Sequence, residues 1–154
     1  MRRSSTPDVM LTFFLVDQKD DPETGLVHAT LSVAIGNRSN EPALYSQIKI
    51  YMDNDFSLPH LSDFTPAGEV QVKYGEHLNT LKAFVRNLSP TSSMPIYREA
   101  NFKLCDIPIT LKPNFYYHFG YDVSCPGMRK QQFGIILNQG KEIRMQDEVI
   151  IGKQ

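Results

Sequence analysis

Hydrophobic and polar side chains alternate along most of this chain, as they do in β-strands that have one face on a core. Apolar residues take every second position in Leu26–Ile35, and a second alternating run covers Ala43–Asp53. The residues between them, Gly36–Pro42, are rich in turn formers. The pattern therefore predicts that the two runs pair as an antiparallel hairpin at the centre of the fold.

Similar alternation predicts further strands on both sides of this hairpin. The first predicted strand is apolar on both faces, so we expect it to be covered on both sides. The segment 77–86 fits a strand or one short helix, and we favour a strand because its neighbours are β. Pro108 marks its strand as an edge or a bulge, and Pro126-Gly127 is typical of a type II turn. The other predicted strands are Asp8–Asp17, Val70–Tyr74, Phe102–Leu111, Phe115–Ser124, Gln131–Leu137 and Glu142–Ile151.

One short motif indicates how the strands are stacked. Leu111, Pro113 and Tyr117 have the spacing of a tyrosine corner, in which the tyrosine hydroxyl reaches back to upstream backbone. This spacing resembles that of immunoglobulin-like and fibronectin-type sandwiches. We therefore predict an all-β fold, an antiparallel immunoglobulin-like β-sandwich of about seven to nine strands. Residues 8–151 would form this domain and residues 1–7 a tail or linker stub.

A wider set of motifs adds a family resemblance. The motifs are Asn37–Ala43, Ile48–Asp53, Met94–Tyr97, Phe102–Leu104, Ile107–Ile109 and Cys125–Met128. Together they resemble CARDB-type modules and the β-sandwich that follows AlbA-type, Schlafen-like ATP-binding domains in many bacterial proteins. The resemblance implies an accessory domain of a larger protein, and a free-standing relative is equally compatible. In that family the nucleotide-binding and nucleic-acid residues lie in the preceding domain, so no functional residue carries over.

Composition narrows the class of protein. The 154 residues suffice for one domain, and their net charge of −1 creates no global field for nucleic acid or anionic membranes. No apolar run reaches the length of a membrane span. Cys105 and Cys125 are expected to be free buried thiols, which is typical of a reducing compartment. We therefore expect a cytoplasmic protein with no membrane partner.

The sequence contains no recognisable motif for catalysis, phosphate binding or metal binding. The four histidines and two cysteines have no zinc-ligand spacing, and no phosphate loop or nucleophile elbow occurs. His28 and His118 fall on polar strand faces, so surface or cross-strand positions are expected. We predict no catalytic residue, no cofactor, no metal and no enzymatic activity.

Two sets of residues are candidates for partner contacts. Tyr45 and Tyr51 take the outward phase of their strand, and Arg129 and Lys130 follow the turn at Gly127. The last strand lacks charged gatekeepers and could pair with another chain if it forms an edge. The leading hypothesis is an interaction or assembly module that binds protein or a second copy through an edge strand. The alternative is binding of nucleic acid or carbohydrate by loop aromatics and Arg129-Lys130.

Overall fold

The protein is described by a computed structural model that covers residues 6–41, 43, 46–53, 64–74, 77–88, 101–113, 115–137, 142–146 and 150–152. Every regular element in these ranges is a strand, which confirms the all-β prediction. The ten strands slightly exceed the expected number. They are β1 (Val9–Asp20), β2 (Val27–Asn37), β3 (Ser46–Asp53), β4 (Thr65–Tyr74), β5 (His77–Leu88), β6 (Asn101–Leu111), β7 (Tyr116–Cys125), β8 (Met128–Leu137), β9 (Glu142–Gln146) and β10 (Ile150–Gly152).

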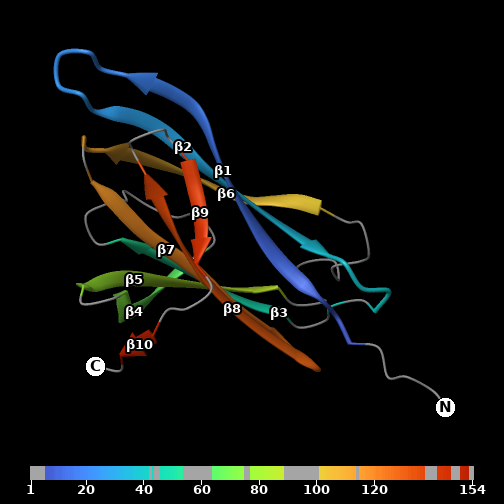
Figure 1. The fold of residues 1–154 in the computed structure, drawn as a ribbon. Coiled ribbons are helices and arrows are strands. Elements are labelled where there is room, and N and C mark those ends of the chain that lie inside the picture. Colours follow the sequence, from blue (N-terminus) through green and yellow to red (C-terminus); the bar gives the residue numbers. More distant parts are fainter. Residues whose placement is uncertain are drawn as a thin grey trace.

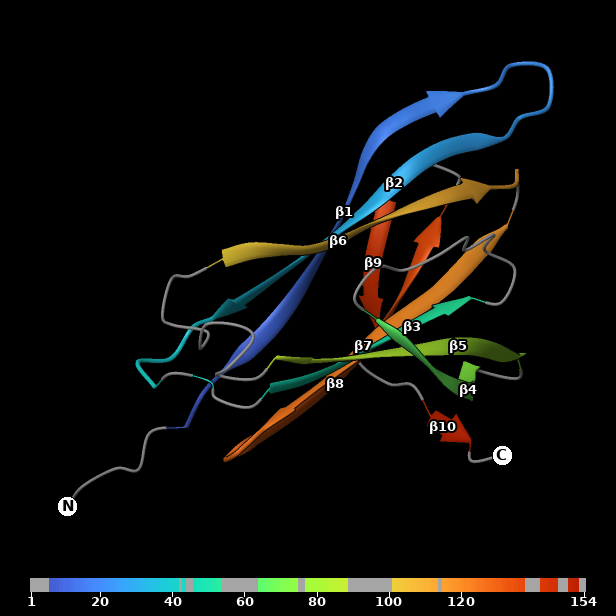
Figure 2. The same ribbon diagram turned by 180° about the vertical axis from the view of Figure 1, so that it is seen from behind.

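The strands form two antiparallel sheets that are stacked face to face. The smaller sheet has the order β1-β2-β6, and the larger has the order β10-β4-β5-β3-β7-β8-β9. Figure 1 shows the small sheet crossing one side of the large sheet. In Figure 2, seen from behind, the turn end of the β1–β2 hairpin projects beyond the large sheet. The β-sandwich expected from alternation is therefore present.

The space between the sheets is filled by the inward side chains of both. Leu31 and Ile35 of β2 are fully buried, as are Ile48 and Ile50 of β3. Complete burial of each such side chain is worth about 1.5–3 kcal/mol relative to exposure. Aromatic rings also pack in this core, where Phe13 lies 4.6 Å from Phe119 between ring centroids. Burial alternates along β2, and from Val27 to Ile35 the buried positions are the apolar ones that the pattern predicts.

The predicted central hairpin is wrong. β2 pairs with β1 and β6, whereas β3 pairs with β5 and β7. The two runs therefore face each other across the core instead of sharing a sheet. Period-2 alternation is the same in both arrangements, because either one buries every second side chain.

Asn37 directs the chain from one sheet to the other. Its side chain is 2% exposed. The Oδ1 atom accepts the N–H of Asp8 at 3.2 Å and that of Ser39 at 3.0 Å, and Nδ2 donates to the Glu41 carbonyl at 2.7 Å. Such local side-chain bonds are typical of Asx turns. They hold the link against β1 and turn it away from β2.

The first strand is covered on only one face, which corrects the expectation of two covered faces. Phe13 is 7% exposed, but Phe14 is 50% and Val16 39% exposed. The pairing with β2 shifts between Val16 and Lys19. Asp17 lies in this bulge with a φ of 53°, which is uncommon for a residue other than glycine.

Two ambiguous segments are resolved by the pairing. Residues 77–86 belong to strand β5, so the helix alternative is wrong. The predicted last strand is instead split into β9, which pairs with β8, and β10, which pairs with β4. These two strands lie at opposite edges of the large sheet.

Two proline positions agree with their predictions. Pro108 lies in β6, which forms an edge of the small sheet. Pro126 and Gly127 connect β7 to β8, where Cys125 is paired with Met128. Gly127 has a φ of 92°, as the third position of a type II turn requires.

Candidate interaction surfaces

The corner at Tyr117 joins the two sheets. Leu111 ends β6 and Tyr117 lies near the start of β7, and both side chains are almost fully buried. The Tyr117 hydroxyl accepts the backbone N–H of Lys112 at 2.8 Å, which is the upstream backbone contact expected from the spacing. Pro113 is exposed in the link. This corner is therefore a structural element that holds β7 in place.

Phe115 lies beside this corner but outside the core. Its side chain is 53% exposed, although the sequence groups it with the apolar face of the following strand. The ring lies 6.4 Å from the ring of Tyr117, and the Lys112 ammonium stands 5.9 Å from the Phe115 centroid. Phe115 thus lies at the end of the sandwich in contact with the Tyr117 ring and the Lys112 ammonium.

Arg129 and Lys130 point to opposite faces of the large sheet, because they are successive residues of β8. Arg129 Nη2 lies 2.8 Å from Asp122 Oδ2, and this hydrogen bond raises the pKa of the guanidinium. Lys130 Nζ lies 2.5 Å from Asp8 Oδ1. Each predicted cation is therefore already bonded to a carboxylate of this chain, which weakens the case for a phosphate site.

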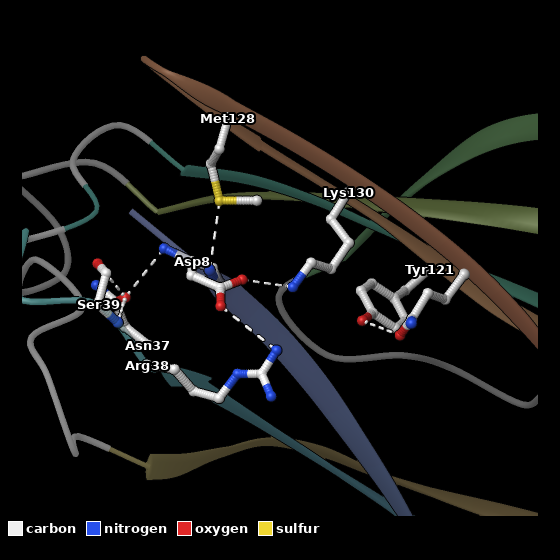
Figure 3. A network of polar contacts seen from close by, with 9 residues as sticks. Asp8, Asn37, Arg38, Ser39, Tyr121, Met128 and Lys130 are labelled. Carbon is white, nitrogen blue, oxygen red and sulfur yellow. Dashed lines mark hydrogen bonds and ion pairs between the residues drawn. The ribbon is translucent and has the colours of Figure 1, made fainter. Parts of the chain in front are cut away.

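Lys130 belongs to a polar seam that closes the sandwich between β1 and β8 (Figure 3). Asp8 lies between Lys130 and Arg38, which approaches it to 3.4 Å. The hydrogen bond from Lys130, with the smaller effect of Arg38, lowers the pKa of the Asp8 carboxyl. The Val9 N–H donates to the thioether sulfur of Met128 at 3.3 Å. The seam therefore links the N-terminal end of β1 to the opposite sheet.

The same seam protects the open edge of β1. Tyr121 donates to Gln132 Oε1 at 2.5 Å within the large sheet. The bond from Val9 to Met128 occupies a backbone N–H of this edge strand with a side chain of the other sheet. On the opposite edge, Pro108 lacks an N–H. Each edge of the small sheet thus has a position where its backbone donor is not available to another strand.

Tyr51 is not an exposed contact residue, contrary to the prediction. It is 4% exposed and its ring stacks on Phe133 at 5.5 Å between centroids. These rings belong to a second apolar cluster on the outer face of the large sheet, with Val72, Leu81 and Ala83. Burial and the nearby Asp122 carboxylate raise the pKa of the Tyr51 hydroxyl. Tyr45 lies outside the described residues.

The two strand histidines have different environments. His28 is exposed, and its Nδ1 lies 3.1 Å from Thr110 Oγ1 on the neighbouring strand, as expected for a cross-strand position. His118 is only 1% exposed, so its predicted surface position is wrong. Its backbone N–H donates to Asp53 Oδ2 at 3.1 Å.

Both cysteines have free thiols and are partly buried. Burial raises the pKa of Cys105 to about 12, and it also raises the pKa of Cys125. A thiol with such a pKa is a poor nucleophile at neutral pH. Within the described ranges, no group of three or more histidine, cysteine or acidic side chains is arranged to hold a metal ion.

The outer face of the small sheet is a surface that the sequence reasoning missed. Phe14 and Val16 stand on it beside small side chains of β2. Cross-strand pairing defines three rows on this face, which are Thr12–Ala34–Lys103, Phe14–Ser32–Asp106 and Val16–Thr30–Pro108. Lys103 and Asp106 form an ion pair of 2.8 Å at the far side of these rows. This face combines exposed apolar side chains with charges of both signs.

No protein-family model matches the chain, and no curated protein matches it. Among solved structures, it is similar to a part of the GH20 exo-β-N-acetylglucosaminidase from Vibrio harveyi, a structure in complex with N-acetylglucosamine. The TM-score is 0.41 at 11% sequence identity, and the match covers 80% of this chain. The chain spans only 17% of that enzyme's length.

The signal for the missed face was present in the sequence. Phe13-Phe14-Leu15-Val16 is apolar at every position, and such a run is typical either of a doubly covered strand or of a strand with an exposed apolar face. In the described part of the chain, nothing covers the outer face of the small sheet. The run in β1 therefore belongs to a strand with an exposed apolar face. No helix in those residues is long and apolar enough to cross a bilayer.

Proposed function

We propose that this chain is a non-catalytic β-sandwich module that binds protein through the outer face of its three-stranded sheet. The observation that supports it is the exposure of Phe14 and Val16, at 50% and 39%, at alternate positions of β1 on one face of the sheet. Exposed apolar side chains that adjoin one another on a protein surface mark candidate contact sites.

On the small sheet, contact through the face fits better than pairing through an edge. At the edge of β1 the Val9 N–H is bonded to Met128, and the edge strand β6 contains Pro108. Pairing through the last strand stays a separate prediction, because β9 and β10 form the edges of the large sheet. A role as an accessory module of a larger cytoplasmic bacterial protein belongs to the same proposal, since such modules dock neighbouring domains through exposed faces.

Binding of nucleic acid or carbohydrate is less well supported. Arg129 and Lys130 are bonded to Asp122 and Asp8, and Tyr51 is buried. A ligand would have to compete with these contacts.

Site-specific photocrosslinking tests the protein-binding proposal. A photoreactive residue replaces Phe14 in one variant and Leu78 in the other, because Leu78 is exposed to a similar degree, 56%, but lies on β5 of the other sheet. We expect crosslinked protein in native cell extract from position 14 and much less from position 78. Absence of any protein adduct at position 14, with purified protein and with extract, would refute the function.

A further inference from the structure

The N-terminal half of β8 has an open edge. β7 pairs with β8 along its whole length, from Met128 to Leu137, whereas β9 pairs only with Phe133–Leu137. On the side of β9, residues 128–132 therefore have no neighbouring strand in the described part of the chain. Figure 1 shows this half of β8 running past the end of β9. The edge of the large sheet is thus incomplete beside residues 128–132.

The turn before β8 decides which backbone groups face this edge. Cys125 and Met128 are paired across a two-residue turn, so they form a hydrogen-bonded pair, and such pairs alternate with non-bonded pairs along an antiparallel ladder. Arg129 and Gln131 lie in the non-bonded pairs, so their N–H and C=O groups point away from β7. Within the described residues, none of these four backbone groups has a hydrogen-bond partner. Both residues are also exposed.

The other long edges of the two sheets are interrupted by prolines or bulges, and this one is not. β6 contains Pro108, and β4 contains Pro66 beside a bulge. β1 has a bulge after Val16. Prolines and bulges of this kind hinder the addition of a further strand. Residues 128–132 contain no proline, and their register with β7 is regular.

We propose that residues 128–132 of β8 bind an extended segment of a different protein, which joins the large sheet as an antiparallel strand in line with β9. The four open backbone groups recognise this ligand, because an extended backbone presents its own N–H and C=O groups at the matching spacing. The site lies on the large sheet, so it goes beyond the proposed function and does not depend on it.

Lys130 leaves room for this strand. An inward-pointing charge on an edge strand can prevent pairing, but the Lys130 ammonium already lies 2.5 Å from Asp8 Oδ1, and its side chain is only 25% exposed. The ligand residue opposite Lys130 points to the same side of the sheet as the Met128 side chain, which packs against the main core. An apolar residue therefore fits at this central position of the ligand.

The register argues against a second copy of this chain as the ligand. Two copies that satisfy all four open groups of each must place Arg129 opposite Gln131 of the other copy. In that register Gly127 of each copy falls opposite Phe133 of the other, where Gln146 already pairs. A separate extended segment has no such turn and no competing strand.

Amide hydrogen exchange of the purified full chain tests whether the edge is open. We expect the N–H groups of Arg129 and Gln131 to exchange about tenfold faster or more than that of Lys130, which is bonded to β7. Equal protection at the three positions would overturn the site.

Binding is tested by NMR titration with a short synthetic peptide of alternating threonine and valine. The control is the same peptide with every backbone nitrogen methylated, which cannot donate hydrogen bonds. The unmodified peptide should slow the exchange of the Arg129 and Gln131 amides about tenfold, and the methylated peptide should leave it unchanged.

A pair of variants shows whether the backbone is what the peptide recognises. Q131P removes the open N–H but leaves the ladder to β7 intact, so it should weaken peptide binding about tenfold or more. Q131A loses the same side chain and keeps the N–H, so it should bind within about threefold of the parent. R129P and R129A repeat the comparison at the other open N–H, and circular dichroism verifies the fold of each variant.

The outcomes separate the possibilities. Unchanged exchange at Arg129 and Gln131 with the peptide, or equal binding by Q131P and Q131A, would overturn the site. A concentration-dependent dimer in sedimentation that Q131P abolishes would make a second copy the ligand and would overturn the assignment to a different protein. Photocrosslinking from position 14 reports on the small sheet, so the proposed function and this site can fail independently.

Discussion

The hydroxyl of Tyr117 accepts the backbone N–H of Lys112 at 2.8 Å, and this bond joins the end of β6 to the start of β7 across the two sheets. The ring is 2% exposed and packs in the core. One side chain therefore contributes apolar burial inside the sandwich and a backbone hydrogen bond at its margin.

Replacing Tyr117 by phenylalanine should reduce the free energy of unfolding by about 1 kcal/mol, the usual worth of one such hydrogen bond. Urea denaturation measures this as a lower midpoint with an unchanged slope. Tyr117→Ala should cost several times more, since it also leaves a cavity. If Tyr117→Phe had the same midpoint as the parent protein, the corner bond would not contribute to stability.

The seam between Asp8 and Lys130 predicts a pH dependence. The hydrogen bond from Lys130 lowers the folded-state pKa of Asp8 from the ordinary aspartate value, so the contribution of Asp8 to stability is fully present above the unfolded pKa and is lost as the pH falls through the folded pKa. Because the Asp8 side chain is 41% exposed, screening limits the effect to about 0.2–1 kcal/mol. Thermal melts from pH 6 down to pH 3 should show a smaller loss of stability in Asp8→Asn than in the parent chain.

A double-mutant cycle with Lys130→Met separates this pair from the rest of the seam. The coupling between Asp8→Asn and Lys130→Met should disappear below the folded pKa of Asp8, because the carboxyl is then neutral in the parent chain. Coupling that is constant across the acid range would show that the two residues interact through packing instead of charge.

Alternation identified the strands but not their sheets. Leu31 and Ile50 both lie on apolar phases, and both are buried as expected. Whether β2 and β3 pair depends on the link between them, where Asn37 bonds to Asp8 and Glu41. These partners come from both sides of the link, so no local pattern specifies the crossing.

The predicted contact residues were misplaced for a related reason. Tyr51 looks exposed in its own strand, yet Phe133 from β8 covers it. Arg129 and Lys130 look like free cations, but their carboxylates come from Asp122 and Asp8. The turn at Pro126-Gly127 was predicted better than these contacts, because a turn type depends on the backbone conformation of its own residues. The positive φ of Gly127 agrees with that prediction.

The close approach of Gly120 to Phe133 predicts a steric effect. A Cβ at Gly120 would lie 2.4 Å from Phe133 Cδ1 and 2.8 Å from the Gln132 carbonyl oxygen. Gly120→Ala should therefore destabilise the protein by about 1–3 kcal/mol, the range for overpacking. Urea denaturation in a Phe133→Leu background should give a smaller cost for the same change, since the ring no longer meets the methyl group. Equal costs in both backgrounds would place the strain at the Gln132 backbone.

The cysteines predict a difference in thiol reactivity. Burial raises the pKa of Cys105 to about 12, and it raises the pKa of Cys125 to a smaller extent. Since only the thiolate reacts, iodoacetamide at neutral pH should modify native Cys105 more slowly than Cys125, as followed by peptide mass spectrometry. In urea the two rates should become similar and faster, because the difference arises from the folded environment. A native Cys105 that reacts as fast as the unfolded thiol would mean that β6 opens readily at this position, which the pairing of Cys105 with Val33 on β2 argues against.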